Sequence, residues 1–416
     1  MASTTDNTNP SGKNGGQHTL WAVPLVVAMG LLSLLALSYL ASILDPQRNL
    51  HDFPLVLVGT DHGAYGEQFT EAVAAALPED QVWLRRTDAA QADSLMSRGE
   101  VYAAIVIPDD FTARATALEN PASDGGPPPT VEFRTNPRAG TTAVTLATQL
   151  VTPALDHASR LLGIGVRANA IANGVQPSDA ALTALTNPVQ VATTQYRPLP
   201  AGTANGISAF YYTLLVVFAG FTGSMMINLG IDAAVANRPD ISRWRVLLYK
   251  WALAAVMALT MAGLYQLIAT ALGMPIDHRL TLYLYSALAS LAIGMTAIAN
   301  LTLVSTIATM LRAPVLNTIG MPINMILFIA LGLPSSGGIM PIQATPRLYG
   351  ALAQFEPMHQ VFLGIRAILY FDARMTAGLT RALTMCAIGL AIALAIGLLA
   401  TVGYDHLRKA PSPDQS

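Results

Sequence analysis

Apolar residues in this chain gather in six long stretches, none of which contains Asp, Glu, Lys or Arg, and the mostly polar block 45–205 separates the first stretch from the other five. The stretches are Leu20–Leu44, Phe210–Leu229, Trp251–Leu272, Leu280–Ala308, Leu316–Leu333 and Ala382–Val402. A helix rising about 1.5 Å per residue would cross the ~30 Å hydrocarbon layer with each of them. The pattern predicts an α-helical integral membrane protein with six transmembrane helices and an extracytoplasmic α/β domain inserted between the first and the second.

Within the polar block, short apolar runs alternate with segments of helical periodicity, which is typical of a small sheet covered by helices. Strands are expected at Phe53–Val58, Val82–Leu84, Val101–Ile107 and Val131–Arg134, and helices at Gly66–Leu77, at a segment that Asp88 and Gln91 open and Gly99 closes, and at Ala139–Ala172. The last of these predicts a stalk helix with a kink near Pro153. The Pro/Gly-rich segment Asn120–Thr130 is expected to be a linker, and Asn173–Thr186 a short connection.

The two ends of the chain are polar, and basic residues in the short loops indicate their side of the membrane. Met1–Thr19 is expected to be a disordered cytoplasmic tail, Leu20–Leu44 an uncleaved anchor, residues 206–402 a five-helix membrane domain and 403–416 a second cytoplasmic tail. With the N-terminus in the cytoplasm, Lys13, Arg238, Arg243, Arg245, Lys250, Arg312, Arg408 and Lys409 fall inside, against Arg279, Arg347, Arg366, Arg374 and Arg381 outside. This bias favours cytoplasmic termini and a domain at 45–205 beyond the outer leaflet. Abundant alanine, and arginine in excess of lysine, indicate a GC-rich bacterial genome, so the expected location of this multi-pass protein is a bacterial inner or plasma membrane.

Composition excludes several classes of function. The chain is 52% hydrophobic and 12% charged with a net charge of -2, and it has no Lys/Arg-rich run, so nucleic-acid binding is not expected. No P-loop, His-Glu-x-x-His or Gly-x-Ser-x-Gly motif occurs, so no cofactor, metal or enzymatic activity is predicted. The single Cys386 is expected to be a buried apolar residue. The pairs Asp61-His62, Asp109-Asp110 and Asp156-His157 are expected on the solvated surface.

The loop between the second and third stretches carries a cluster of charged and aromatic residues. These are Arg238, Asp240, Arg243, Trp244 and Arg245. Such a cluster can anchor the topology through its positive charge. It can also be a docking element for a separate ATPase, with Trp244 as a buried anchor.

Polar side chains inside the apolar stretches need hydrogen-bond partners, because an unsatisfied group in hydrocarbon is costly. Gln266, Asn300, Asn317 and Asn324 are of this kind. They can bond between helices or line a path for a substrate. In the last stretch, Gly389, Ala393 and Gly397 recur every four residues, a spacing that lets helices approach closely within the chain or across a dimer.

The loop 334–378 is unusually long, and its apolar residues keep helical spacing in two short segments. These are expected to be re-entrant or interfacial helices, which form either an outer gate or a lid that packs the spans. Candidate gate residues are Pro346, Pro357 and Arg366.

Motifs in both halves of the chain resemble those of ABC-type export permeases, most closely the YhgE/Pip branch. They comprise Leu55–Val58 with Asp61, then Gly66 to Phe69, then the run Ser97–Phe111 (SRGEVYAAIVIPDDF), and in the late loop Pro341, Pro346, Pro357 and Gly364-Ile365-Arg366. The resemblance implies a permease that moves a lipid, envelope component or drug outward. It also implies a homodimer of twelve spans and a separate cytoplasmic ATPase as partner.

The competing class is non-transporting. YhgE/Pip-like proteins include candidates for membrane-anchored receptors or secretion accessories whose outer domain binds a partner. Copurification of a stoichiometric ATPase would separate the two classes.

Overall fold

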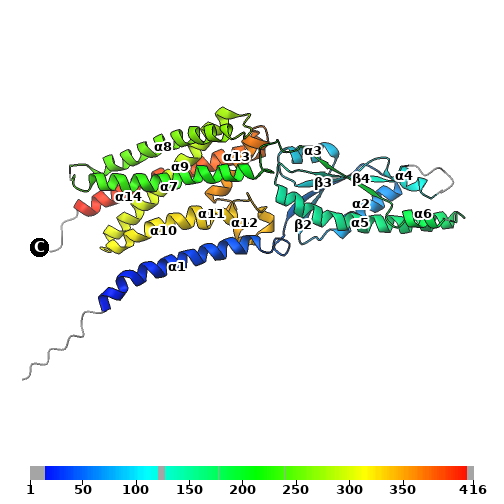
Figure 1. Ribbon diagram of the computed structural model, residues 1–416, viewed down its shortest axis with the longest axis horizontal. Coiled ribbons are helices and arrows are strands. Elements are labelled where there is room, and N and C mark those ends of the chain that lie inside the picture. The colour runs from blue at the N-terminus through cyan, green and yellow to red at the C-terminus, as the bar shows by residue number, and fades with distance from the viewer. Residues whose placement is uncertain (1–14, 120–126, 177, 239, 410–416) are drawn as a thin grey trace, which may run out of the picture.

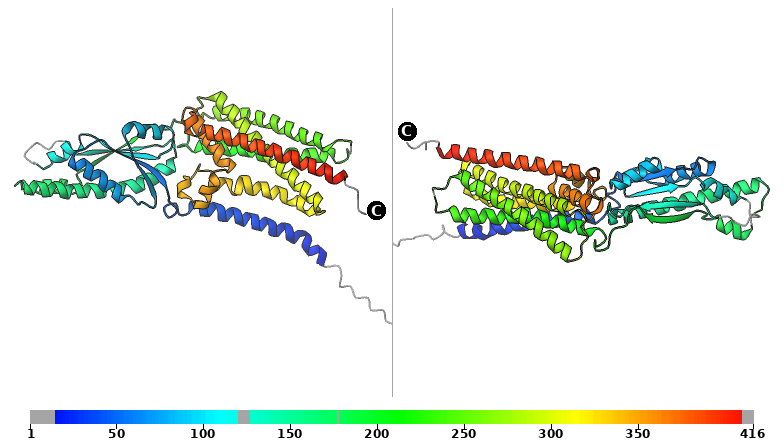
Figure 2. Two further views of the ribbon diagram at one scale, coloured as in Figure 1. Left: turned by 180° about the vertical axis from the view of Figure 1, so that it is seen from behind. Right: turned by 90° about the horizontal axis from the view of Figure 1, so that it is seen from above.

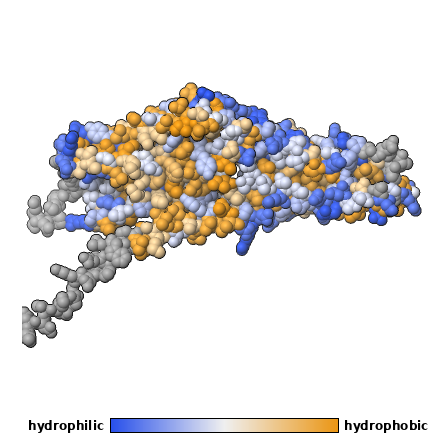
Figure 3. All heavy atoms as spheres, viewed as in Figure 1, coloured by the Kyte–Doolittle hydropathy of each residue, from blue (hydrophilic) through white to orange (hydrophobic). Residues whose placement is uncertain are grey.

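The computed structural model describes residues 15–119, 127–176, 178–238 and 240–409 and has two parts joined end to end (Figure 1). One part, the membrane half, consists of α1 (Gly15–Ile43) and of residues 206–409; the other, here called the domain, is formed by residues 45–205. Six helical segments are long and apolar enough to cross a membrane, as predicted. Apolar surface covers much of the membrane half, whereas polar surface predominates on the domain and at the opposite end (Figure 3). The chain is therefore a multi-pass membrane protein.

One span, α1, precedes the domain in sequence and five follow it. The regular helices among the five are α7 (Ile207–Val235), α8 (Arg243–Ala271), α9 (Arg279–Met310) and α14 (Leu379–Lys409). The fifth span is broken into η1 (Pro314–Ile319), α10 (Gly320–Met325), the π-helix η2 (Ile326–Ala330) and α11 (Gly332–Ser335). Pro314, Pro322 and Pro334 lie along this span, and each removes a backbone donor. The proline spacing thus explains why this span departs from a regular α-helix.

Close contact between α7 and α9 holds the centre of the membrane half together. A Cβ added at Gly220 would lie 2.5 Å from the Ser290 carbonyl oxygen, and one added at Gly294 would lie 2.4 Å from Ser224 Oγ. In a membrane the hydrophobic effect does not drive helices together, so their association depends on close van der Waals packing. Small residues such as these glycines allow the two backbones to approach closely enough for it. Two of the three small residues of α14 pack internally, since Ala393 is fully buried and Gly397 lies against Trp251, whereas a Cβ at Gly389 would have no neighbour within 4 Å.

The late loop forms η3 (Ile342–Ala344), α12 (Arg347–Ala353), α13 (Pro357–Tyr370) and η4 (Met375–Ala377), near the domain end of the spans (Figure 1). Most of α13 is buried, and it packs against α7, α9 and α14. Gly364 permits this, because the Tyr285 ring would lie 2.2 Å from a Cβ there. The two expected short helices are present, and α13 is part of the packed interior.

The first span contacts the rest of the membrane half mainly near the domain, at η2 and α11. There Ser38 Oγ donates to the Ala330 carbonyl (2.9 Å) and Tyr39 Oη donates to the Ile329 carbonyl (3.1 Å). Toward its other end α1 diverges from α10 in two views (Figures 1 and 2). Leu25, Val26 and Met29 are correspondingly more than half exposed in the isolated chain.

The domain is a five-stranded mixed sheet in the order β2-β1-β3-β4-β5. Its strands are β1 (Phe53–Gly59), β2 (Val82–Arg86), β3 (Ala103–Ile107), β4 (Thr130–Thr135) and β5 (Gln190–Gln195), and only the β3–β4 pair is antiparallel. Its helices are α2 (Ala64–Ala76), α3 (Ala89–Ser97), α4 (Phe111–Ala117), α5 (Thr141–Ala172) and α6 (Asp179–Ala184). Phe53, Leu55 and Leu57 of β1 belong to the core with α2 and α5, and Val56 and Val58 to the core with α3. The alternation of side chains along a strand thus gives this sheet two buried faces.

Asp61, expected on the surface, is instead buried between β1 and α4. Its carboxylate accepts from the Gly63 amide (2.6 Å), the Thr112 amide (2.5 Å) and Thr112 Oγ1 (2.7 Å). Burial alone would raise its pKa, but these hydrogen bonds hold the pKa of Asp61 below its usual value. A Cβ at Gly66 would lie 2.6 Å from Asp61, so the small residue of this motif makes room for the carboxylate.

Other differences from the sequence reading concern short elements and the chain ends. The elements α4, α6 and β5 were not predicted, and α6 lies in the segment expected to be a connection. The first helix begins at Gly15, within the expected tail, and α14 continues to Lys409, beyond the expected end of the last span. The remainder of both tails, residues 1–14 and 410–416, and linker residues 120–126 lie outside the described residues.

Candidate functional site

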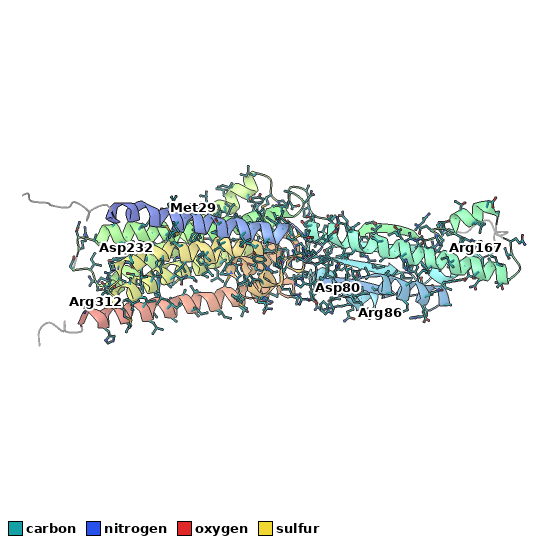
Figure 4. The ribbon with its side chains drawn as sticks, turned by 90° about the horizontal axis from the view of Figure 1, so that it is seen from below. Met29, Asp80, Arg86, Arg167, Asp232 and Arg312 are labelled. Atoms are coloured by element: carbon teal, nitrogen blue, oxygen red, sulfur yellow. The ribbon has the colours of Figure 1, made fainter. Side chains whose placement is uncertain are left out.

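A cavity of about 550 Å³ opens between the ends of the spans that point away from the domain. Its walls come from α7, α8, α9, η1 and α14. Three cations and one carboxylate line it, from Arg238, Arg243, Lys250 and Asp232, together with hydroxyl groups and apolar side chains. Asp232 and Arg312 mark this end of the membrane half, opposite the domain with Asp80, Arg86 and Arg167 (Figure 4). We call it the distal cavity.

A buried ammonium group stands in the wall of the distal cavity. Lys250 is 7% exposed, and its Nζ lies 2.6 Å from Asp232 Oδ1 and donates to Asn228 Oδ1, also 2.6 Å away. The charge-free stretches are shorter than the helices that contain them, because α7 continues to Val235 and α8 begins at Arg243. Both charged groups therefore lie on spanning helices, whereas the sequence placed them in a loop.

The first turn of α8 contacts the end of the last span. Arg243 Nη2 donates to Tyr404 Oη (2.9 Å) and its guanidinium lies over the Tyr404 ring, and Trp244 Nε1 donates to Asp405 Oδ2 (3.1 Å). Ser242 caps α8 by accepting from the Arg245 amide, although the distance is 3.4 Å. Of the five residues expected to couple an ATPase, Arg238, Asp240 and Arg245 are exposed, while Trp244 is half-buried in this intramolecular contact.

The four residues of the expected path do not come together. Asn317 lines the distal cavity. Asn300 Nδ2 donates to Asn324 Oδ1 (2.9 Å), and Asn324 Nδ2 donates to the Ala297 carbonyl (3.0 Å). Gln266 lies in a separate groove between α8 and α9 at the domain end. Two of the four therefore make the helix-to-helix bonds that membrane burial demands.

The family profile described as "Protein of unknown function (DUF3533)" matches residues 25–393, which cover five of the spans, the domain and part of the sixth span. The chain belongs to this family. No curated protein matches it, and no solved structure matches it.

The candidate gate residues of this DUF3533 chain lie at three separate places. Pro346 precedes α12 and Pro357 is the first residue of α13. Arg366 projects from α13 toward the domain, where its Nη1 donates to the Ala139 carbonyl (2.9 Å). Their role as an outer gate stays a prediction.

Sequence reasoning missed a buried acid and a half-buried base at the start of α13 of the DUF3533 chain. Glu356 caps α13, with Oε2 accepting from the His359 amide (3.0 Å), and His359 Nδ1 lies 2.8 Å from the Ser336 carbonyl oxygen. Burial raises the pKa of Glu356 to about 7 and lowers the pKa of His359 to about 4. One feature of the sequence could have indicated the role of Glu356. It directly precedes Pro357, and proline is common at the first position of a helix, just after the N-cap residue.

Chemically, the distal cavity suits a molecule that is both polar and apolar. Three cations and one carboxylate line it, so its lining has an excess of positive charge. The side chains of Val246, Leu247 and Leu301 form an apolar part of its wall. Within the described residues no group of three or more His, Cys, Asp or Glu side chains could hold a metal ion.

Proposed function

We propose that this protein is the membrane permease subunit of an ABC-type, YhgE/Pip-like exporter. It would move a hydrophobic or amphiphilic compound, such as a lipid, envelope component or drug, outward. A separate cytoplasmic ATPase would power it, because the sequence has no P-loop. The observation that carries the proposal is the distal cavity, whose charged rim and apolar walls would admit an amphiphile between the spans.

The proposed orientation places the distal cavity and both termini in the cytoplasm and the domain outside a bacterial inner or plasma membrane. Basic residues at the cavity end, including Arg238, Arg245 and Arg312, support it through the positive-inside bias. A homodimer would supply the twelve spans that the resemblance implies.

The coupling hypothesis is best tested at exposed residues that have no partner on another helix among the described residues. Arg243 and Trp244 have partners on α14, so their replacement would disturb the fold as well as any docking. Arg238 and Arg245 are exposed and are better probes. They could pair with acidic groups of an ATPase.

The test is copurification of the full-length protein with a soluble ATPase from its native membrane. We expect a stoichiometric ATPase whose activity rises with amphiphile, and loss of that association in the Arg238→Glu, Arg245→Glu double variant. Arg312→Glu is the matched control, since Arg312 is exposed at the same end but does not line the cavity. A protein that purifies without any ATPase and transports nothing in vesicles would contradict the proposal.

A second candidate function is a membrane-anchored receptor or secretion accessory, and one feature of the domain favours it. The strand β5 forms an edge of the sheet, and all six of its residues are exposed. A free edge can pair with a strand of another protein. If this function holds, a partner would be retained by the domain and lost when β5 carries a proline at Thr193.

A further inference from the structure

A second cavity, of about 230 Å³, lies where the domain meets the membrane half. The connection between β4 and α5, the start of α7, the loop before η3, and α13 all contribute to its walls. We call it the junction cavity. It is separate from the distal cavity, which lies at the far ends of the spans.

Two arginines, Arg138 and Arg366, line the junction cavity, and no carboxylate among the described residues lines it. Arg138 donates to the carbonyls of Pro198 (3.2 Å) and Tyr370 (2.8 Å). Arg366 donates to the Ala139 carbonyl, while its Nε is buried and has no hydrogen-bond partner in the part of the chain that the structure describes. Both side chains are partly buried and donate their hydrogen bonds to neutral carbonyl groups, and neither forms an ion pair with a carboxylate of the described residues.

The nearest carboxylate on this side is already engaged. Asp372 Oδ2 pairs with Arg197 Nη1 (2.9 Å) and lies 3.7 Å from Arg374 Nη2. Burial accordingly lowers the pKa of Arg366, and burial also lowers the pKa of Arg138 despite the charge of Asp372. Asp277 also acts on Arg138 through its charge, but neither Asp277 nor Asp372 lines the cavity, so the lining itself carries an excess of positive charge.

The N-terminus of a long helix adds donors to the same wall. No side chain caps α5, and its first bond within the helix runs from the Val144 amide to the Gly140 carbonyl. The backbone amides of Thr141, Thr142 and Ala143 therefore have no acceptor within the helix, and these three residues line the cavity. Such amides, with the helix dipole behind them, favour an anion.

The cavity also borders the level at which a lipid headgroup would sit. Ile207 and Tyr211, on the first turns of the span α7, line it and are 43% and 63% exposed. Exposed aromatic residues at the ends of spans are typical of the membrane surface. An amphiphile could therefore place its charged group in the cavity and its chain along α7.

We propose that the junction cavity binds a phosphate group, held by Arg366, Arg138 and the first amides of α5. The preferred source is the headgroup of an anionic phospholipid. The inference goes beyond the proposed function, because binding here requires neither transport nor an ATPase.

The test is a binding titration of the full-length protein in a non-ionic detergent with three probes: dihexanoyl phosphatidate, dihexanoyl phosphatidylcholine and inorganic phosphate. We expect saturable binding of phosphatidate that is weakened about tenfold or more by Arg366→Gln, as for the loss of a charged hydrogen bond. Arg366→Lys, which keeps the charge, should bind with intermediate affinity. Inorganic phosphate bound as tightly as phosphatidate would identify a soluble anion as the source, and weaker binding would identify the lipid.

The matched control is Arg374→Gln, because Arg374 is an arginine at the same end of the molecule whose side chain is 40% exposed and does not line the cavity. It should bind like the unmodified protein. Melting temperatures of all variants show whether they fold, and Arg138→Gln provides an independent variant. Absence of saturable binding by phosphatidate and phosphate, or equal affinities in Arg366→Gln, Arg138→Gln and the control, would overturn the proposal.

Discussion

The ion pair of Lys250 and Asp232 is the clearest charged contact on the spanning helices. Lys250 is buried, whereas the Asp232 side chain is 46% exposed. A buried ammonium group without its partner is costly, and a pair costs much less. The contact therefore links α7 to α8 at the rim of the distal cavity.

We expect Asp232→Asn to lower the stability of the protein by about 1–3 kcal/mol, since it leaves the buried Lys250 with only Asn228 as a partner. The double variant Asp232→Asn, Lys250→Met should recover most of the loss, because no buried charge remains. Thermal unfolding in detergent measures both. Asp240→Asn, at an exposed position near this end, is the control, and a double variant as unstable as the single one would argue against the pair.

Glu356 and His359 should give opposite dependences of stability on pH. The pKa of Glu356 rises from 4.5 to about 7 on folding, so the folded state holds an extra proton and stability from this group falls as pH rises from 4.5 to 7. The pKa of His359 falls from 6.5 to about 4, so stability from this group rises as pH rises from 4 to 6.5. In the unmodified protein the two effects largely cancel between pH 4.5 and 6.5.

Single variants separate the two effects. His359→Asn should lose stability as pH rises to 7, and Glu356→Gln should gain stability up to pH 6.5, each by at most about 1.4 kcal/mol per pH unit. Melting temperatures measured across this range give the two slopes. Equal slopes in both variants would show that burial does not shift these groups.

At the scale of whole elements, the crossing of α7 and α9 depends on glycines that the sequence left unremarked. Ser290 presents its carbonyl to Gly220, so an added methyl group meets backbone that cannot rotate away. Overpacking of this kind forces helices apart.

Gly220→Ala is therefore expected to destabilise the protein by about 1–3 kcal/mol. Gly230→Ala is its control on the same helix, because a Cβ there has no neighbour within 4 Å. That control should be neutral or slightly stabilising, since alanine is the better helix former. Melting temperatures compare the two variants, and equal values would contradict the close crossing.

The elements predicted from the sequence contain runs of apolar residues, whereas an element without such a run was missed. The spans were found because a membrane requires continuous apolar length, and β1 and β3 because both their faces are buried. By contrast β5, with sequence QVATTQ, is exposed throughout and has no alternation to detect. Asp88 was recognised correctly as the cap of α3, because it accepts from the Gln91 amide (2.7 Å).

The candidate sites were predicted less well, because they depend on how distant segments meet. Asn300 and Asn324 are 24 residues apart and bond to each other, and Trp244 reaches Asp405 on the last span. Arg366, a candidate gate residue, donates to the Ala139 carbonyl of the domain and lies over the rings of Phe362 and Phe371, and its role at a gate stays a prediction. The sequence shows which polar residues lie within apolar stretches. It does not show which of them form hydrogen bonds with one another, because that depends on how distant segments pack.

At the scale of the whole molecule, the domain and the distal cavity occupy opposite ends (Figure 1). The orientation proposed above is tested by single cysteines in a chain where the buried Cys386 is replaced by alanine. In intact cells an impermeant maleimide should label Asp80→Cys on the domain and not Asn237→Cys beside the cavity. After permeabilisation both should react, since both positions are exposed. Labelling of Asn237→Cys alone in intact cells would invert the topology.

The divergence of α1 has a mechanical consequence. Hydrogen bonds of Ser38 and Tyr39 fasten this helix near the domain, while Leu25, Val26 and Met29 farther along it are exposed in the isolated chain. In a membrane, the thickness of the bilayer would therefore influence the tilt of α1. The chain then passes within ten residues from Ile43 to β1, an inner strand of the sheet. A thinner bilayer would tilt the helix about this fastening and pull on that strand, so the domain is positioned to register strain in the surrounding membrane.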